Sequence, residues 1–247
     1  MLPKRVRSAK RAKVLRPRSI RGVRPYSTDE VDQLLAKEYG PATWRPRKDG
    51  VSELVLTILS QHTSDLNSDR AFDELWNRFG SWAAVMHATP DLVADAIRSG
   101  GLAEQKAPRI QGVLREVLER CGRFDISFLS DLPLAEAKSW LRSLPGVGPK
   151  TAAVVLCFAL GMPAFPVDTH IHRVALRVGL IGPRVSADKA HDVLEVSIDS
   201  DRVYPLHVYL ITHGRRVCKS QRPLCDQCVL AQRCPSRGQF AIHPGAH

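Results

Sequence analysis

The chain has 247 residues, 44% of them hydrophobic, so it is long enough for one large domain or two small ones with a proper core. It contains no apolar run near the ~20 residues that span a bilayer, and no secretory pattern of charged start, apolar stretch and small-residue cleavage site. We therefore expect no membrane association and a cytoplasmic location. The formal net charge of +11 comes almost entirely from residues 1–24, which hold ten Lys or Arg and no acid.

The basic segment is expected to form a disordered tail over residues 1–26. Such a run of like charges repels itself and is attracted to polyanions. Two other interpretations stay open: a solvated, dispensable extension, and an organelle transit peptide. The two Ser residues and the weak amphipathicity of the segment fit a transit peptide poorly.

Helical patterns dominate the next part of the chain. Residues 27–30 (Ser-Thr-Asp-Glu) form a capping box, which predicts that a helix starts there. Residues 51–59 are strongly apolar and are expected to form a buried helix, although periodicity alone does not exclude a strand. Asp65 is a candidate N-cap of the following helix. Residues 104–120 then repeat apolar side chains at helical spacing.

The second half continues as helices joined by short turns. Pro133 is expected to open a helix that ends near Leu144, and a further helix is expected from Pro149 to Leu160. Three more helices are predicted to start at N-caps Asp168, Ser186 and Asp201. Because no alternating strand pattern, hairpin signal or internal repeat is present, the sequence predicts an all-α fold.

Four cysteines near the C-terminus share the tight spacing C-x6-C-x2-C-x5-C: Cys218, Cys225, Cys228 and Cys234. Without a secretory signal, clustered cysteines bind metal more often than they form disulfides. Structural zinc sites usually pair C-x2-4-C units across a longer gap, and only Cys225 and Cys228 form such a unit. Iron–sulfur clusters also take four cysteines at short, irregular spacing, so both metals stay open from the residues alone. The other two, Cys121 and Cys157, lie in apolar helical contexts and are expected to be core thiols.

A glycine-rich turn joins two predicted helices over residues 144–150. Its glycines permit backbone angles that side chains forbid, and Pro149 suits the first turn of the following helix. The free N–H groups of the turn and the helix N-terminus form an anion site that suits a DNA phosphate, at Gly146, Val147 and Gly148. A nucleotide P-loop is excluded, because Pro149 separates Gly148 from Lys150. An ordinary tight turn beside a solvent-facing lysine is the alternative.

Lys150 lies in the first turn of a helix, where the helix dipole disfavours a cation. Such a lysine is costly unless a phosphate or a function compensates. To act as an amine nucleophile it must lose its proton, and moving its pKa from ~10.4 to about 7.5 takes roughly 4 kcal/mol. The dipole supplies only ~0.3–1 kcal/mol, so burial or other cations must supply the rest.

A nearby carboxylate that takes the proton during the reaction is the alternative to a lowered lysine pKa. Asp168, in the sequence Pro-Val-Asp-Thr-His at 166–170, is the candidate. An aspartate before a helix is also a common N-cap, so a purely structural role has to be weighed against this one. An anion beside Lys150 favours the protonated amine, so a working pair must be poised, for example when substrate excludes water.

Three motifs in chain order resemble one family. They are Leu-Pro-Gly-Val-Gly-Pro-Lys-Thr-Ala at 144–152, Val-Asp-Thr-His-Ile-His-Arg-Val at 167–174 and the cysteine spacing at 218–234. Together they resemble the endonuclease III family of helix-hairpin-helix DNA glycosylases, over roughly residues 27–235. The resemblance implies two α-helical lobes with DNA across the cleft between them. The implied parts are a helical bundle over 47–163 with its hairpin at 144–150, a second lobe of 27–46 plus 164–235 with a cluster loop at 218–234, and a loose end at 236–247.

The resemblance also implies a chemistry. Lys150 matches the catalytic lysine, Asp168 the catalytic aspartate, and the four cysteines the ligands of a [4Fe–4S] cluster. A damaged nucleotide is flipped out of the duplex, the lysine amine attacks the sugar C1′, and the resulting Schiff base permits β-elimination. The implied protein is a monomeric DNA glycosylase with apurinic/apyrimidinic lyase activity, associated with the bacterial nucleoid. Its partner is double-stranded DNA with a damaged base or an abasic site, and its substrates are oxidised pyrimidines.

Other functions remain alternatives at this point. A uracil or thymine mismatch glycosylase can use the same scaffold, whereas Lys150 argues against an adenine-mismatch enzyme. A non-catalytic helix-hairpin-helix DNA-binding protein with a structural zinc is the alternative from a different class.

The flipped nucleotide leaves a gap, and the resemblance assigns two loops to it. In the segment 60–65, which contains Gln61, the position of the usual glutamine wedge falls on His62. In the segment 101–107, Leu102 matches a second wedge, although an ordinary loop leucine is the plain alternative. Basic residues around the cysteine loop are candidates for contacts with the DNA backbone or for simple solvation: Lys219, Arg222 and Arg233.

Overall fold

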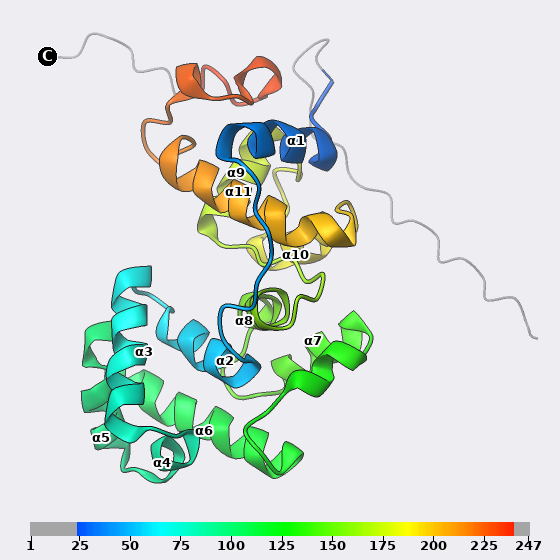
Figure 1. The fold of residues 1–247 in the computed structure, drawn as a ribbon. Helices are drawn as coiled ribbons and strands as arrows, with labels where there is room; N and C mark the ends of the chain where they lie inside the picture. The colour runs from blue at the N-terminus through cyan, green and yellow to red at the C-terminus, as the bar shows by residue number, and fades with distance from the viewer. Residues whose placement is uncertain (1–23, 240–247) are drawn as a thin grey trace, which may run out of the picture.

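The computed structural model describes residues 24–239, and within them every regular element is a helix (Figure 1). The all-α prediction is therefore confirmed, and residues 51–59 form a helix rather than a strand. No helix of this part of the chain is long and apolar enough to cross a membrane. Most of the predicted basic tail lies outside the described residues. Tyr26, which the sequence assigned to that tail, is instead buried in an apolar core.

One group of helices encloses an apolar core built between Val51 and Ala164. Helix α2 (Gly50–Leu59) forms its centre, because all ten of its residues are buried. A π-helical turn at Val155–Ala159 extends the last helix of the group, as the sequence predicted for a helix reaching Leu160. The other members are α3 (Asp65–Phe79), α4 (Trp82–His87), α5 (Pro90–Ala96), α6 (Ala103–Cys121), α7 (Leu134–Arg142) and α8 (Pro149–Val154), with 3-10 turns at Arg98–Gly100 and Ser127–Asp131.

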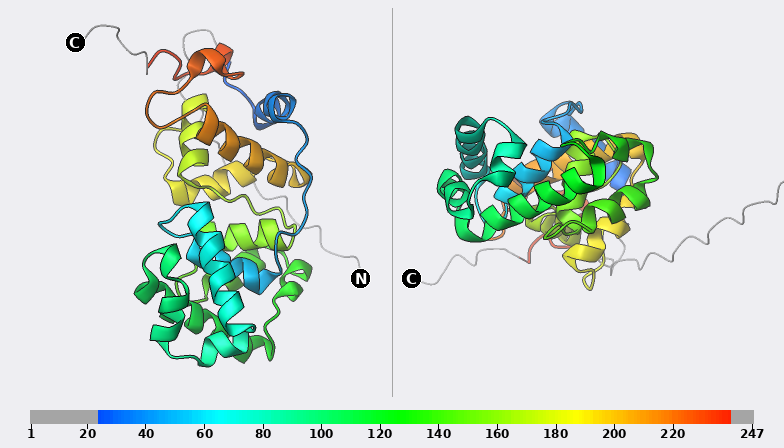
Figure 2. Two further views of the ribbon diagram at one scale, coloured as in Figure 1. Left: turned by 60° about the vertical axis from the view of Figure 1, so that its left-hand side comes forward. Right: turned by 90° about the horizontal axis from the view of Figure 1, so that it is seen from below.

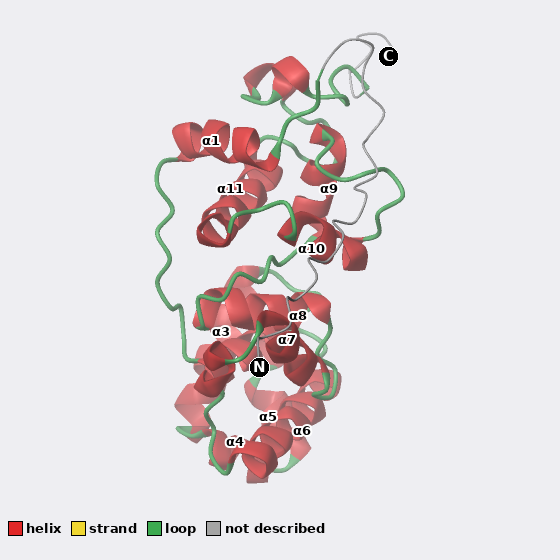
Figure 3. Cartoon of the chain, turned by 90° about the vertical axis from the view of Figure 1, so that its right-hand side faces the viewer, coloured by secondary structure: helices red, strands yellow, loops and turns green. Residues whose placement is uncertain are grey.

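A second apolar core combines the N-terminal helix with the C-terminal part of the chain. Because α1 (Thr28–Tyr39) packs against α11 (Val203–Arg216), it joins this core rather than the bundle that follows it in sequence. Figures 2 and 3 show the two groups stacked, with the segment from α1 to α2 running along one side. The remaining members are α9 (Thr169–Val178), α10 (Ala187–Glu195) and 3-10 turns at Ser200–Arg202, Cys225–Gln227 and Ala231–Arg233.

Side-chain caps set the start of most helices. The capping box over residues 27–30 is present, and Asp168 and Ser186 cap α9 and α10 as predicted. In each case the cap oxygen accepts a backbone N–H that the helix itself leaves without a partner.

Two predicted caps are wrong. Helix α3 is capped by Ser64, whose hydroxyl accepts the N–H of Asn67, and Asp65 lies in the first turn instead. Asp201 lies inside a 3-10 turn, and α11 follows that turn without a side-chain cap. An acidic residue near a helix start satisfies the helix dipole as well as a cap does, so sequence alone did not separate the two positions.

The helix-hairpin-helix element consists of α7, a short turn and α8. Gly146 has a φ of +73°, in the left-handed region that glycine tolerates best. Gly148 differs from the prediction: its φ of −90° and ψ of 180° are ordinary extended values that any residue adopts. The glycine at 148 therefore matters for the open space around it, since a Cβ there would meet no atom within 4 Å.

Two ion pairs join the helix groups. The Lys138 ammonium on α7 lies 2.6 and 2.7 Å from the Glu195 carboxylate oxygens on α10, and Glu195 also accepts the N–H of Phe165 at 3.0 Å. On another side, Arg215 of α11 lies 2.8 Å from Asp65 of α3. These contacts hold two separate cores in one arrangement, which is the condition for a site shared between them.

Candidate functional site

Lys150 and Asp168 line one pocket of about 240 Å³. The pocket takes its wall from α2, α3 and α8 of the first helix group, and from the start of α9 and from α11 of the second. Residues far apart in the sequence therefore meet at one hollow between the two cores.

Asp168 uses one carboxylate oxygen as a helix cap. Its Oδ1 accepts the N–H of Ile171 at 2.7 Å, which fixes the side chain at the N-terminus of α9. Among residues 24–239 no hydrogen bond is made to Oδ2, and the side chain lines the pocket. The capping role weighed against the chemical one is thus real, and it leaves one oxygen available for the site.

Lys150 is the second residue of α8 and its side chain is exposed. None of the ion pairs formed within residues 24–239 includes it, so the amine is not neutralised by Asp168 or by another carboxylate of that range. Burial therefore does not desolvate this amine in the free protein. Water has to be removed from around it by whatever binds in the pocket.

His207 of α11 also lines the pocket and was not found by sequence reasoning. Its Nδ1 lies 3.0 Å from the Pro166 carbonyl oxygen, and since a carbonyl only accepts, Nδ1 carries the proton. Burial lowers the pKa of His207 to about 4. The residue is therefore a neutral imidazole of fixed tautomer next to Asp168 at neutral pH.

An ion pair with one buried partner holds another residue of the wall, Arg47, and was also missed. Glu53 of α2 is fully buried, and its carboxylate pairs with the guanidinium of Arg47, whose Nε lies 2.9 Å from Oε2. Arg47 and Arg215 both line the pocket. The sequence held one signal for a buried charge, because Glu53 is the single charged residue of the apolar run 51–59.

The two predicted wedge residues, His62 and Leu102, both have left-handed backbone angles. His62 has a φ of +56° and is exposed, and Leu102 has a φ of +51° and is 45% exposed. Such angles are uncommon for residues with a Cβ and are costly to hold. The neighbouring Gln61 is occupied elsewhere, because its Oε1 accepts from Arg109 Nη1 at 2.6 Å. Of the pair Gln61 and His62, it is His62 that extends freely from the surface.

The three turn residues predicted to contact DNA differ in their exposure. Gly146 and Gly148 are exposed, whereas the Val147 side chain is buried at 6% exposure in the first core. The backbone N–H of Val147 donates to the Leu144 carbonyl oxygen at 3.2 Å, so the turn itself uses this donor. A Cβ on Gly146 would lie 2.6 Å from Arg109 Cδ, so the turn and Arg109 pack closely.

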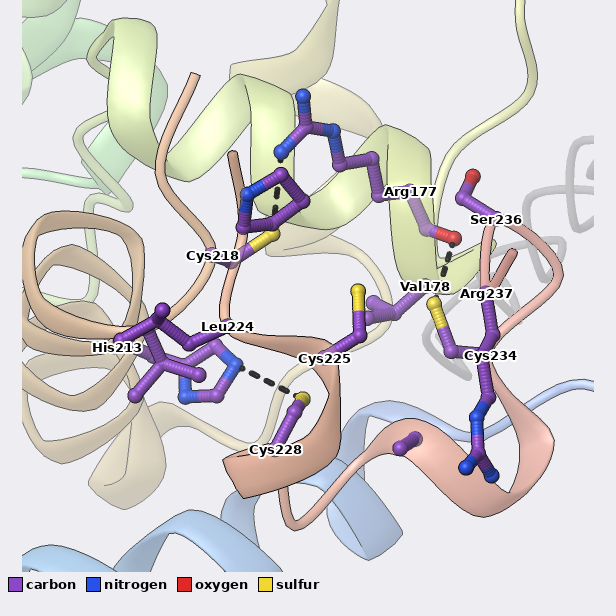
Figure 4. A pocket seen from close by; sticks show the side chains of 13 residues that line it. Arg177, Val178, His213, Cys218, Leu224, Cys225, Cys228, Cys234, Ser236 and Arg237 are labelled. Carbon is purple, nitrogen blue, oxygen red and sulfur yellow. Dashed lines mark hydrogen bonds between the residues drawn. The ribbon is translucent and has the colours of Figure 1, made fainter. Parts of the chain in front are cut away.

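The four cysteines line one cavity at the end of the second helix group (Figure 4). The cavity wall between them is largely apolar, with Val178, Val217 and Leu224. Burial is the main cause that raises the pKa of the Cys228 thiol, to about 11, and it also raises that of Cys234. No three His, Cys, Asp or Glu side chains of residues 24–239 are placed to hold a single metal ion. The predicted ligands thus surround a common space, and none forms a disulfide.

Polar groups around this cavity contact the cysteine sulfurs. The His213 Nε2 lies 3.4 Å from Cys228 Sγ, and its Nδ1 lies 2.9 Å from the hydroxyl of Tyr39. Arg177 Nη1 lies 3.5 Å from Cys218 Sγ. Figure 4 shows His213 and Arg177 on different sides of the cavity. Arg177 can only donate, so its contact favours negative charge on the Cys218 sulfur.

The other two cysteines follow the prediction to different degrees. Cys157 is buried at 1% exposure, and burial raises its pKa to about 12. Cys121, at the end of α6, is only partly buried against the first core. Neither of them lines the cysteine cavity.

Of the basic residues near the cysteine loop, Arg233 does not face solvent freely. Its guanidinium lies 2.8 Å from Glu30 and 4.1 Å from the centre of the Tyr26 ring, so it joins the loop to the start of α1. Lys219 and Arg222 are exposed.

The comparisons with known proteins agree with the arrangement of these elements. Residues 55–199 match the family model described as the HhH-GPD superfamily base excision DNA repair protein. Endonuclease III of Thermotoga maritima is 33% identical over 181 residues, covering 73% of this chain and 80% of the relative. Endonuclease III of Sulfolobus acidocaldarius is 34% identical over 183 residues, covering 73% and 79%.

A solved structure agrees as well. The structure of a trapped endonuclease III–DNA covalent intermediate superimposes with a TM-score of 0.73 at 27% identity, covering 85% of this chain and 96% of that one. The resemblance drawn from the sequence motifs is therefore confirmed. This chain belongs to the HhH-GPD superfamily of base excision DNA repair proteins, and it is a DNA glycosylase that binds DNA.

Proposed function

We propose that this chain is a bifunctional glycosylase that removes damaged pyrimidines from duplex DNA and then cleaves the strand as an apurinic/apyrimidinic lyase. One observation carries the proposal: Lys150 and Asp168 line the same pocket, formed between two helix groups that each bring one of them. A primary amine beside a carboxylate at a hollow of nucleobase size is what Schiff-base chemistry at a flipped sugar requires.

The reaction follows from these two groups. The neutral amine of Lys150 attacks C1′ of the extrahelical deoxyribose, and the C1′–N bond breaks as its electron pair leaves with the base. Asp168 Oδ2, which is not used by the helix cap, stabilises the positive charge that develops on the sugar and accepts the proton of the attacking amine. The C1′–O4′ bond of the resulting adduct then breaks as O4′ takes a proton, and the opened sugar is held as a protonated Schiff base on Lys150. This Schiff base acidifies C2′–H, and loss of that proton expels the 3′ oxygen of the strand.

DNA itself supplies the desolvation that Lys150 lacks in the free protein. A nucleotide that enters the pocket displaces water from around the amine, and the bound duplex covers the amine from solvent. The exposed Gly146 and Gly148 of the turn offer backbone N–H groups to a phosphate of the strand, and the open space at Gly148 lets that phosphate approach. His62 and Leu102, both on exposed loop positions, enter the gap that the flipped nucleotide leaves.

The cysteine cavity fits a [4Fe–4S] cluster. Four thiols around one shared space suit a group of several atoms, whereas zinc needs its four sulfurs within ~2.3 Å of one point. The ligands would be Cys218, Cys225, Cys228 and Cys234, and the iron charge would offset the burial that disfavours free thiolates. The cluster would hold the loop after α11 in place and supply no step of the base excision.

Trapping with borohydride tests the lyase. The wild-type protein is incubated with a duplex that contains one abasic site, and reduction of the Schiff base should leave a covalent protein–DNA adduct. Lys150→Ala and Lys150→Gln should form no adduct while they still bind the duplex. The matched control is Lys189→Gln, an exposed lysine of α10 outside the pocket, which should give the full adduct.

Two outcomes would redirect the assignment. If the wild-type protein gives no adduct on abasic DNA, the chain is a glycosylase that uses water and has no lyase activity. If it gives an adduct but excises uracil or mismatched thymine in preference to oxidised pyrimidines, the mismatch enzyme is the correct member of the superfamily. Iron and sulfide analysis of the purified protein tests the cluster, and a colourless protein that contains zinc would refute it.

A further inference from the structure

The wall of the pocket holds a guanidinium with unused hydrogen-bond donors. The Nε and Nη2 groups of Arg47 donate to the carboxylate of Glu53, which is fully buried in α2. A buried carboxylate requires such a partner, because an unpaired charge in an apolar core is strongly destabilising. The pair therefore fixes the orientation of the guanidinium plane with respect to α2.

Two more contacts hold Arg47 in place. Its guanidinium carbon lies 5.3 Å from the centre of the Phe158 ring, and its backbone N–H donates to the Phe158 carbonyl oxygen at 3.4 Å. Thr57, which also lines the pocket, lies with its hydroxyl 3.4 Å from Glu53 Oε1. Arg47 is thus braced by α2 on one side and by the π-helical turn on the other, so it is preorganised before a ligand arrives.

The remaining donors of Arg47 are on Nη1. A guanidinium carries five N–H donors in a fixed fork and cannot act as an acceptor. Within residues 24–239 no protein acceptor bonds to Nη1, although the side chain lines the pocket and is 47% exposed. Arg215, the other arginine of the wall, is instead paired with Asp65. Arg47 therefore presents Nη1 donors that are available to a base.

An unused acceptor lies in the same wall. Asp69 of α3 lines the pocket, is exposed, and has no ion-pair or hydrogen-bond partner among the described residues. It is close enough to interact electrostatically with Arg47. The wall therefore presents N–H donors that can bond a carbonyl oxygen and a carboxylate that can accept from an N–H.

We propose that Arg47 and Asp69 select the excised base, and that they favour pyrimidine-2,4-diones over 4-aminopyrimidines. A dione has carbonyl oxygens on both sides of its N3–H, so Arg47 finds an acceptor in either orientation while N3–H donates to Asp69. A 4-aminopyrimidine places a donor at C4 and has no proton on N3 for Asp69. A site built to bond specific groups rejects analogues that leave those groups unpaired. The inference rests on the proposed glycosylase function and names its substrate class.

A matched pair of lesions tests the selection. Duplexes that contain 5-hydroxyuracil or 5-hydroxycytosine at one position differ only in the group at C4 and the proton at N3. Wild-type protein should excise 5-hydroxyuracil faster in single-turnover assays. Arg47→Lys keeps a cation beside Glu53 but removes the Nη1 donors. It should slow excision of 5-hydroxyuracil by about 10- to 100-fold, because hydrogen bonds to charged groups are lost, and should reduce the preference between the two lesions.

Cleavage at a preformed abasic site is the internal control, because no base occupies the pocket there. Arg47→Lys should cut and trap abasic DNA as the wild type does. Arg45→Lys, at an exposed position that does not line the pocket, should leave both activities unchanged. Asp69→Asn does not involve the buried pair, so it keeps the test available if Arg47→Lys folds poorly. Its amide can donate to an unprotonated N3, and it should shift the preference towards 5-hydroxycytosine.

Three results would overturn this assignment: unchanged excision of 5-hydroxyuracil by Arg47→Lys, an equal loss on both lesions, or an unchanged preference in Asp69→Asn. A loss of abasic-site cleavage in Arg47→Lys would also count against base selection, because it would show that Arg47 maintains the structure of the whole site. Failure of the proposed function looks different, since the wild-type protein itself would then give no adduct with abasic DNA.

Discussion

At the scale of single residues, Asp168 shows how one side chain can cap a helix and still present an oxygen to a pocket. One oxygen caps α9 and the other is left at the pocket. The sequence presented these as competing interpretations of one aspartate. The structure makes them compatible, because a carboxylate has two oxygens and a helix N-terminus needs only one of them.

Substitutions at position 168 should separate the two roles. Asparagine caps helices as well as aspartate does, so Asp168→Asn should change the free energy of unfolding by less than about 0.5 kcal/mol, whereas Asp168→Ala should lower it by about 1 kcal/mol. Both variants should slow base excision by about 100-fold or more, because the charge at the sugar is lost. Denaturant unfolding and single-turnover excision are the measurements. An Asp168→Asn protein with wild-type excision would contradict the chemical role.

His207 should make stability depend on pH. Its pKa is about 4 in the folded protein and ordinarily 6.5, so between these values the unfolded chain binds more protons. The free energy of unfolding should therefore fall as pH drops from 6.5 to 4, by up to about 3 kcal/mol from this residue. Nearby charges are Asp168, Lys150 and Arg215.

The comparison protein is His207→Asn, whose amide can still donate to the Pro166 carbonyl. It should lose this part of the pH dependence. His191 and His213, whose pKa values are also lowered by burial, contribute equally to both proteins, so the difference isolates His207. Parallel stability–pH curves for the two proteins would show that His207 is not buried as a neutral imidazole.

At the scale of elements, α6 connects three surface loops through two side chains. The buried ammonium of Lys106 donates to the Leu59 carbonyl at the end of α2 and to the Gly100 carbonyl ahead of Leu102, at 2.7 and 2.8 Å. Arg109, one turn later, bonds Gln61 and packs on the turn at Gly146. The loops that carry His62, Leu102 and the hairpin are thus fixed relative to one helix.

Lys106→Met should loosen this arrangement. It removes two hydrogen bonds from a charged donor and should lower the free energy of unfolding by about 2 kcal/mol, since part of the loss is offset by no longer burying a charge. Amide hydrogen exchange should become faster at residues 59–62 and 100–102. Lys189→Met, on an exposed face of α10, should change stability by less than about 0.5 kcal/mol. Unchanged exchange in both loops would show that Lys106 does not hold them.

At the scale of the whole molecule, the pocket exists because two cores are held side by side. The Lys138–Glu195 pair lies at their junction, with only 19% and 16% of the two side chains exposed. Glu195 also receives the N–H of Phe165, in the segment that leads from the first core to Asp168. A change at this junction therefore acts on the spacing between Lys150 and Asp168.

A double-mutant cycle should measure this junction. Lys138→Met and Glu195→Gln, alone and together, should give a coupling energy of about 1–3 kcal/mol in unfolding experiments, because the pair is poorly hydrated. The exposed pair Arg70–Glu74 of α3 is the reference and should give less than about 0.5 kcal/mol. A coupling energy at the junction no larger than that of the reference would show that the ion pair does not join the cores.

Local signals in the sequence determined the helical class, several helix starts, the hairpin and the four-cysteine loop. They succeeded because capping, helical periodicity and cysteine spacing act over a few neighbouring residues, as at residues 27–30 and at Asp168. Asp65 and Asp201 were misplaced by one or two positions, because acidic side chains suit both the cap and the first turn.

Tertiary structure decided which residues share the pocket. Arg47, Asp69, Lys150 and His207 come from four separate segments, and nothing local in the sequence relates them. Their meeting depends on how the second core, which unites α1 with α9 to α11, packs against the first. The sequence determines which charged side chains are present. The packing of the two cores sets the distances between them, and those distances determine which charges act together.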